Sequence, residues 1–131
     1  MVDKKIRVLI SKSALDAHDR GPRYLIQLLR DAGMEVIFSR YAVVEEVIKQ
    51  GIEEDVDVIG LSFYGAGLMH DCQRVVSLKK AKDMEDVLFI VGGTIMPDEK
   101  ARLLEMGVNG VFEPNVGKPE DIVGFITSWN S

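Results

Sequence analysis

The sequence is too poor in cysteine to build a disulfide framework or a zinc site. Cys72 is the one cysteine among 131 residues, and no Cys/His cluster has metal-ligand spacing. No apolar run reaches the roughly 18 residues that a membrane span needs, and the amino terminus shows no signal segment. We therefore expect a cytoplasmic protein that has no membrane partner.

Basic charge is also scarce. Sixteen Lys and Arg face 21 Asp and Glu, which gives a formal net charge of −5. Binding to nucleic acid needs a basic surface, so a nucleic-acid partner is not expected. The length suits one domain over residues 1–131, and it excludes an eight-stranded α/β barrel, which needs about 250 residues.

Short runs rich in Val and Ile alternate with longer amphipathic segments along the whole chain. This alternation predicts a parallel sheet covered by helices. We expect an α/β, flavodoxin-like (Rossmann-like), doubly wound five-stranded sheet of order 2-1-3-4-5, with ligands bound at the carboxyl ends of the strands. The predicted strands are 6–10, 35–38, 56–61, 87–91 and 110–112, and the predicted helices are 22–32, 43–53, 69–81, 97–106 and 120–128.

A polar loop, Lys12–Gly21, follows the first predicted strand and contains one of the two histidines. Asp16 precedes His18 by two residues. Such a carboxylate can hold one imidazole N–H while the other nitrogen binds a metal. Lys12 could hydrogen-bond the same carboxylate. In the alternative interpretation, Asp16 only caps the loop and His18 is solvated.

Two further loops fall at the same predicted edge of the sheet. Ser62 and Tyr64 follow the third strand, together with Gly65, and Gly92-Gly93 follows the fourth. Glycine pairs at such junctions often have only a conformational role. Because these strands are neighbours in the predicted order, however, the three loops would line one cleft that suits a large ligand.

Two other functions of this fold are disfavoured, one by a single position and one by the composition of a loop. A phosphoacceptor receiver domain needs an Asp where the third strand ends, and this sequence has Ser62 there. A flavodoxin needs a phosphate loop rich in Ser and Thr after the first strand, and Lys12–Gly21 contains one serine.

Asp16-x-His18-x-x-Gly21, Ser62-x-Tyr64 and Gly92-Gly93 together resemble the D-x-H-x-x-G, S-x-L and GG pattern of cobalamin-binding domains. The resemblance implies that His18 is the lower axial ligand of cobalt. It also implies that the displaced dimethylbenzimidazole tail lies between strands 1 and 3. Ser62 would then hydrogen-bond the tail, and the glycine pair would leave it room.

The longer stretch from Lys12 to Gly21 is similar to the loop of the methylmalonyl-CoA mutase class, and the segment around Phe112 is similar as well. This resemblance implies that Lys12, Asp16 and His18 form the axial-ligand network. It implies adenosylcobalamin as the cofactor, held by Leu15, Asp16, His18, Asp19, Arg20, Gly21, Ser62, Tyr64, Gly65, Gly92, Gly93, Phe112 and Pro114.

The resemblance further implies an isomerase subunit that is inactive alone and acts with a large barrel subunit, which binds the acyl-CoA substrate. A stand-alone corrinoid carrier or storage protein is the alternative. Corrinoid domains of methyltransferases usually have a helical bundle before the histidine loop, and only about ten residues precede it here, which favours the mutase interpretation. The sequence does not identify the acyl group.

Some residues depart from the pattern of the class. Glycines of the class are replaced by Ala14, Ala17, Glu113 and Asn115, and its S-x-L leucine is replaced by Tyr64. We expect Phe63, Tyr64 and Leu68 to form an apolar rim on which the partner subunit docks.

Overall fold

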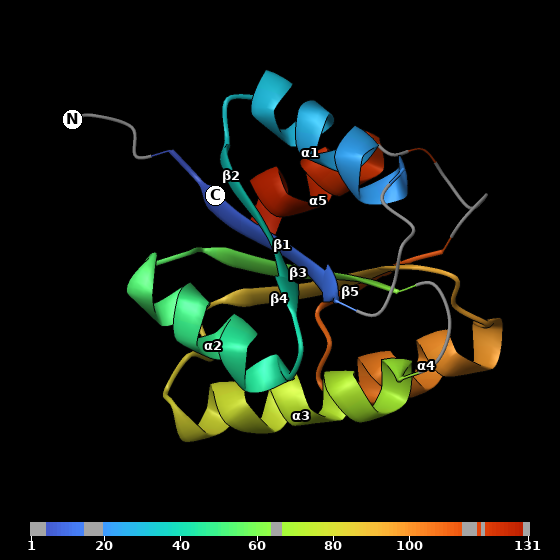
Figure 1. The fold of residues 1–131 in the computed structure, drawn as a ribbon. Coiled ribbons are helices and arrows are strands. Elements are labelled where there is room, and N and C mark those ends of the chain that lie inside the picture. Colours follow the sequence, from blue (N-terminus) through green and yellow to red (C-terminus); the bar gives the residue numbers. More distant parts are fainter. Residues whose placement is uncertain (1–4, 15–19, 64–66, 114–117, 119, 130–131) are drawn as a thin grey trace.

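The computed structural model describes residues 5–14, 20–63, 67–113, 118 and 120–129. Strands and helices alternate along the chain (Figure 1). The elements are β1 (Arg7–Ser13), α1 (Arg20–Asp31), β2 (Glu35–Tyr41), α2 (Val44–Glu53), β3 (Val58–Phe63), α3 (Leu68–Ala81), β4 (Leu88–Gly93), α4 (Pro97–Met106), β5 (Gly110–Phe112) and α5 (Glu120–Trp129).

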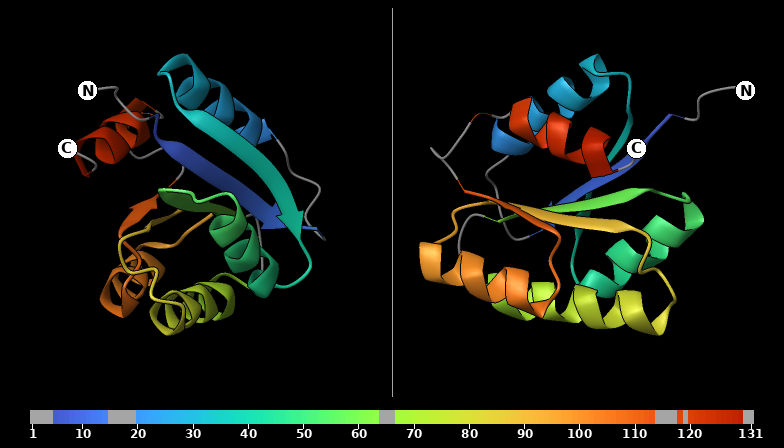
Figure 2. Two further views of the ribbon diagram at one scale, coloured as in Figure 1. Left: turned by 90° about the vertical axis from the view of Figure 1, so that its left-hand side faces the viewer. Right: turned by 180° about the vertical axis from the view of Figure 1, so that it is seen from behind.

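The strands form one parallel sheet in the order β2-β1-β3-β4-β5, which confirms the prediction. Helices α1 and α5 cover one face, and α2, α3 and α4 cover the other (Figure 2). Each face has its own apolar core. Alternate strand residues supply the two cores, because successive side chains of a strand point to opposite faces.

The core under α1 and α5 contains Val8, Ile10, Val58, Leu88 and Ile90. Their strand neighbours Leu9, Ile59, Phe89 and Val91 belong to the core under α2, α3 and α4. These strands are buried on both faces, which explains why their sequences are almost continuously apolar.

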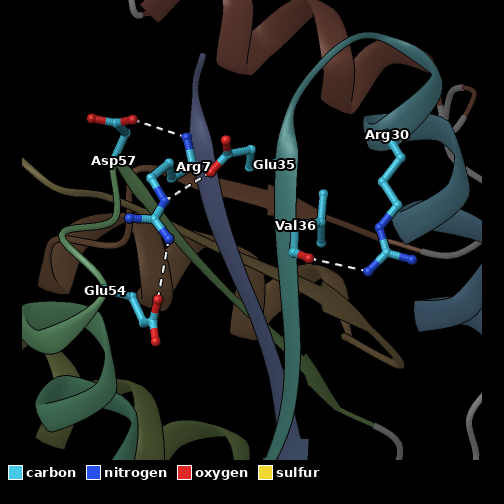
Figure 3. Close-up of polar contacts among 6 residues, drawn as sticks. All are labelled: Arg7, Arg30, Glu35, Val36, Glu54 and Asp57. Atoms are coloured by element: carbon cyan, nitrogen blue, oxygen red, sulfur yellow. Dashed lines mark hydrogen bonds and ion pairs between the residues drawn. The ribbon is translucent and has the colours of Figure 1, made fainter. Parts of the chain in front are cut away.

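Arg7 joins several elements at the amino ends of the strands (Figure 3). Its guanidinium lies 3.1 Å from Glu35 at the start of β2 and 3.1 Å from Glu54 at the end of α2. Its backbone N–H donates to Asp57 Oδ2 at 2.9 Å. This edge of the sheet is therefore held by ion pairs.

Four predicted strands end too early. β1 continues to Ser13, β2 to Tyr41, β3 to Phe63 and β4 to Gly93. Lys12, Ser62 and Gly92 therefore lie in strands and not in loops. The prediction followed the apolar side chains, whereas the hydrogen bonds of a ladder are made by the backbone. Polar residues and glycine therefore extend a strand without an apolar signal.

The helix predictions need smaller corrections. α4 is confirmed at both ends. α1 begins at Arg20, two residues before the predicted start, and the other helix limits differ by one residue where they differ. Among the helices that the structure describes, none combines the length and the apolar composition needed to cross a bilayer.

Candidate functional site

Four predicted site residues lie side by side across the carboxyl ends of four strands. Lys12 pairs with Ser62, Ser62 with Gly92, and Gly92 with Phe112. Directly paired residues of parallel strands point to the same face. This row lies two residues beyond Ile10, Gly60 and Ile90, so it faces α1 and α5. The sheet thus brings together residues that are as many as 100 positions apart in sequence.

Lys12 occupies a different environment from the one the sequence predicted. It was expected in a polar loop, but it lies in β1 and its side chain is fully buried. An ammonium group is strongly hydrated, so its burial is favourable only when it is paired. Lys12 thus brings a buried amino group next to Ser62 at this end of the sheet.

Ser62 and Gly92 are paired neighbours on the α1 and α5 face. Both residues are half-buried. A Cβ added to Gly92 would have as its nearest neighbour the backbone oxygen of Phe112 at 3.6 Å, which is ordinary contact. At Gly60, in the preceding row, a Cβ would meet Ile10 at 2.9 Å and Ile90 at 3.3 Å. Among the described residues, side chains crowd a Cβ at Gly60, whereas a Cβ at Gly92 would meet only Phe112, at ordinary contact distance.

Gly93 is glycine for another reason. Its φ is +121°, and a Cβ there would overlap the backbone of Phe63, including the carbonyl oxygen. The same oxygen accepts a hydrogen bond from the N–H of Thr94 at 2.9 Å. Gly93 therefore lets β4 approach the end of β3 closely, and it lies on the opposite face from Gly92.

Phe112 ends the row on β5. Its ring packs edge-to-face on Phe125 of α5, with centroids 5.5 Å apart and an interplanar angle of 80°. The next residue, Glu113, has only 12% of its side chain exposed and pairs with Lys100 of α4 at 2.8 Å. A carboxylate fixed by an ion pair therefore replaces the glycine that the family pattern has at this position.

Several predicted residues lie outside the part of the chain that the structure describes. They are Leu15, Asp16, His18, Asp19, Tyr64, Gly65 and Pro114, along with the departures Ala17 and Asn115. Arg20 and Gly21 are the first two residues of α1. Only their backbone belongs to the described part of the structure. Among the residues that are described, no group of three His, Cys, Asp or Glu could hold a metal.

The predicted apolar docking rim is wrong for the two of its residues that the structure describes. Phe63 and Leu68 are each 4% exposed and belong to the core under α2, α3 and α4. Where the structure describes this edge, exposed apolar side chains include Val43 and Met96, the residues that precede α2 and α4. The sequence pattern did not separate these positions from the core.

Cys72 and His70 both lie in α3. His70 is exposed, and Cys72 is fully buried. Burial, with a smaller contribution from the charge of Asp71, raises the pKa of the Cys72 thiol to about 12. The thiol is therefore neutral and unreactive at physiological pH.

Tyr41 and Asp71 belong to none of the predicted motifs. The Tyr41 hydroxyl donates to Asp71 Oδ2 at 2.8 Å, close to the same edge of the sheet. The two residues are 30 positions apart and come from elements that are not neighbours in the chain. No local spacing signals such a contact.

Comparison with known proteins decides which of the fold's functions applies. The family model described as B12 binding domain matches residues 6–122. The chain belongs to this B12-binding family. Among its relatives, the pivalyl-CoA mutase small subunit of Xanthobacter autotrophicus is 37% identical over 95% of this chain and 84% of the relative. The 2-hydroxyisobutanoyl-CoA mutase small subunit of Aquincola tertiaricarbonis is 38% identical over 94% and 90%.

Longer mutases contain the same B12-binding unit. Methylmalonyl-CoA mutase of Escherichia coli is 33% identical over 85% of this chain, which corresponds to 16% of that protein. Within the B12-binding family this chain is thus the cobalamin-binding subunit of an acyl-CoA mutase. The enzyme class is isomerase, and the cofactor is adenosylcobalamin.

Solved structures agree on the fold. A cobalamin-binding protein from Desulfitobacterium hafniense superposes with a TM-score of 0.80 at 19% identity, over 96% of this chain and 60% of that chain. The NarL receiver domain from Mycobacterium tuberculosis has a TM-score of 0.74 at 14% identity, over 98% and 99%. At these identities the likeness shows the fold alone, and Ser62 stands where a receiver needs its Asp.

The described residues of this B12-binding chain fit a bound cobalamin. A flat, largely apolar nucleotide base needs a space that no Cβ fills, and Gly92 provides one on the α1 and α5 face. Ser62 adds a hydroxyl that can donate or accept at the border of that space. Lys12 adds a buried cation in the same row.

Proposed function

We propose that this chain binds adenosylcobalamin at the carboxyl edge of its sheet, with His18 as the lower axial ligand of cobalt. The observation that carries the proposal is the row of Lys12, Ser62, Gly92 and Phe112. Residues from motifs far apart in the sequence lie next to one another at one edge and on one face of the sheet. A binding site for one large ligand requires that its residues be adjacent in this way.

Each predicted residue has a chemical task in this proposal. When bound, adenosylcobalamin would supply the radical chemistry for a 1,2-shift of the carbon skeleton. His18 offers one imidazole nitrogen to the metal, and Asp16 accepts the N–H of the other. This carboxylate fixes the tautomer of His18 and raises its basicity. Lys12, buried in β1, moderates the charge of Asp16.

The nucleotide tail would lie over Ser62 and Gly92 on the α1 and α5 face. Ser62 holds it by a hydrogen bond, and the missing side chain at Gly92 leaves space for it. Gly93 contributes indirectly, because it brings the end of β4 against Phe63. The apolar core beneath this row, which includes Ile10 and Ile90, excludes water from below.

The partner is a large barrel subunit that binds the acyl-CoA substrate. The relatives that align over most of this chain are called small subunits, and the longer methylmalonyl-CoA mutase carries this unit as one part of its chain. The isolated chain is inert in the proposal, and a cytoplasmic location suits its free Cys72.

Electron paramagnetic resonance of the cob(II)alamin complex tests the axial ligand. The full chain is prepared unlabelled and with nitrogen-15 histidine, because the two isotopes have different nuclear spins. We expect the axial nitrogen splitting to change from a triplet to a doublet on labelling. His18→Ala should lose the labelled splitting.

His70→Ala is the matched control, since His70 is the only other histidine and is exposed. It should retain the labelled splitting in full. A splitting that labelling leaves unchanged, or one that depends on His70, would refute the proposed ligand. Adding the large subunit and an acyl-CoA then separates the mutase from a corrinoid carrier, because only the mutase forms the rearranged thioester.

A further inference from the structure

Tyr41 makes two contacts at the carboxyl end of β2. Its side chain is buried, with 3% of the residue exposed, in the core under α2, α3 and α4. Its carbonyl oxygen accepts a hydrogen bond from the N–H of Ala14 at 2.8 Å. Its hydroxyl donates to Asp71 Oδ2 at 2.8 Å. One residue thus joins the end of β1 to the first turn of α3.

Asp71 extends this connection to Gly67. The N–H of Asp71 donates to the carbonyl of Gly67 at 2.9 Å. Its carboxylate lies over the same glycine, because a Cβ on Gly67 would be 3.7 Å from Asp71 Oδ2. Gly67 has a φ of +95°, which favours glycine. Ala14, Tyr41, Asp71 and Gly67 therefore form a continuous chain of contacts, which we call the Tyr41 bridge.

The Tyr41 bridge is anchored at its centre. The two residues after Tyr41 donate their N–H groups to Glu46 Oε1, Ala42 at 2.6 Å and Val43 at 3.1 Å. These bonds fix the backbone where β2 enters α2. A hydrogen bond from a buried hydroxyl to a carboxylate is stronger than one between neutral groups, so the hydroxyl is a firm link.

The two ends of the Tyr41 bridge adjoin the segments that carry the predicted cofactor residues. Ala14 is followed in sequence by Leu15 to Gly21, which contain Asp16 and His18. Gly67 is preceded by Tyr64 to Ala66 and, before them, by the end of β3 with Ser62. The Tyr41 bridge therefore links the chain that enters the histidine loop to the chain that leaves the β3–α3 loop.

We propose that Tyr41 is a positioning residue for the cofactor and that its hydroxyl bond to Asp71 fixes Ala14, after which the one segment begins, relative to Gly67, before which the other ends. The inference rests on the proposed function, because it assigns the axial ligand and the tail pocket to those segments. Tyr41 lies on the opposite face of the sheet from Lys12 and Ser62. It acts through the backbone and does not touch the ligand.

Three variants of the full chain separate positioning from general stability. Tyr41→Phe keeps the ring and removes the hydroxyl. Asp71→Asn keeps an acceptor oxygen without charge. Tyr24→Phe is the matched control, because Tyr24 lies on α1 and is 54% exposed. Cobalamin affinity, the nitrogen-15 splitting, thermal unfolding and amide hydrogen exchange are measured for each.

We expect Tyr41→Phe to weaken cobalamin binding by about tenfold, with Asp71→Asn intermediate and Tyr24→Phe unchanged. In Tyr41→Phe a smaller fraction of the bound cobalt should show the labelled axial splitting. Without ligand, amides in residues 14–21 and 64–67 should exchange faster than in the control. A purely structural role would lower the unfolding temperature and leave the splitting of the bound cobalt unchanged.

The possible failures can be told apart. If Tyr41→Phe matches Tyr24→Phe in affinity, splitting and exchange, the positioning role is wrong. The same conclusion follows if only its unfolding temperature changes. If the wild-type chain itself shows no effect of labelling, the proposed axial ligand fails instead. Hydrogen exchange at the two segments then still decides whether the hydroxyl holds them.

Discussion

At the scale of single residues, the adjacent glycines Gly92 and Gly93 have different structural roles. Gly92 has space beside its Cα, whereas Gly93 has a φ of +121° and lies against the backbone of Phe63. We expect Gly92→Ala to change the free energy of unfolding by no more than about 1 kcal/mol. Cobalamin affinity should fall by about tenfold, because the added methyl fills the proposed tail pocket.

Gly93→Ala should have the opposite profile, with a loss of about 3 kcal/mol or more from strain and overlap. Urea unfolding and cobalamin titration of both variants measure the contrast. Equal destabilisation of the two, or unaltered affinity in Gly92→Ala, would contradict this assignment.

The sequence identified the glycine pair, the serine and the lysine but not their environments. Gly92-Gly93 was predicted as one gap, because the sign of φ and the face of a strand cannot be read from a dipeptide. Lys12 was predicted in a polar loop because the apolar run of the first strand ends at Ile10. In the structure the strand continues through it, and the backbone ladder determines its position.

At the scale of elements, the two edges of the sheet have separate tasks. The carboxyl edge carries the candidate site, and the amino edge carries the ion pairs of Arg7. We expect Arg7→Gln to lower the free energy of unfolding by about 1 kcal/mol, since these pairs are partly exposed. The difference from wild type should shrink at high salt, because salt screens exposed charges.

Cobalamin affinity provides the control for Arg7→Gln. Both the affinity and the nitrogen-15 splitting should equal those of wild type, because the candidate site lies at the other end of the strands. A loss of affinity in this variant at unchanged stability would show that the two edges are coupled.

The existence of every element followed from the alternation of apolar runs with amphipathic segments, and some ends did not. α4 has Pro97 at its start and Gly107 as its C-cap, and its limits were predicted correctly. β1, β3 and β4 end in Ser13, Phe63 and Gly93, after residues whose side chains carry no strand signal. The predictable ends are those with a local stop signal.

At the scale of the whole molecule, the strand order could be predicted because parallel strands joined by helices allow few topologies. The order then determined which distant motifs meet. The Tyr41–Asp71 contact could not be predicted in this way. It depends on the separation between β2 and α3, and α2 packs against both of these elements.

Because of Cys72, we expect the free energy of unfolding of the whole molecule to decrease as the pH rises into the alkaline range. Burial raises the pKa of its thiol from 9.0 to about 12 in the folded chain. The folded state therefore favours the protonated thiol. The resulting stabilisation is complete below the unfolded pKa of 9.0 and is lost as pH rises toward about 12. At pH 10 the loss is on the order of 1 kcal/mol.

Urea unfolding of wild type and Cys72→Ala, at about pH 8 and about pH 10, isolates this contribution from the other groups that titrate there. Cys72→Ala should be less stable at both pH values, because it leaves a cavity in the core under α2, α3 and α4. The advantage of wild type should be smaller at the higher pH. An advantage that stays constant would mean that Cys72 ionises as readily in the folded chain as in the unfolded one, and would contradict its burial.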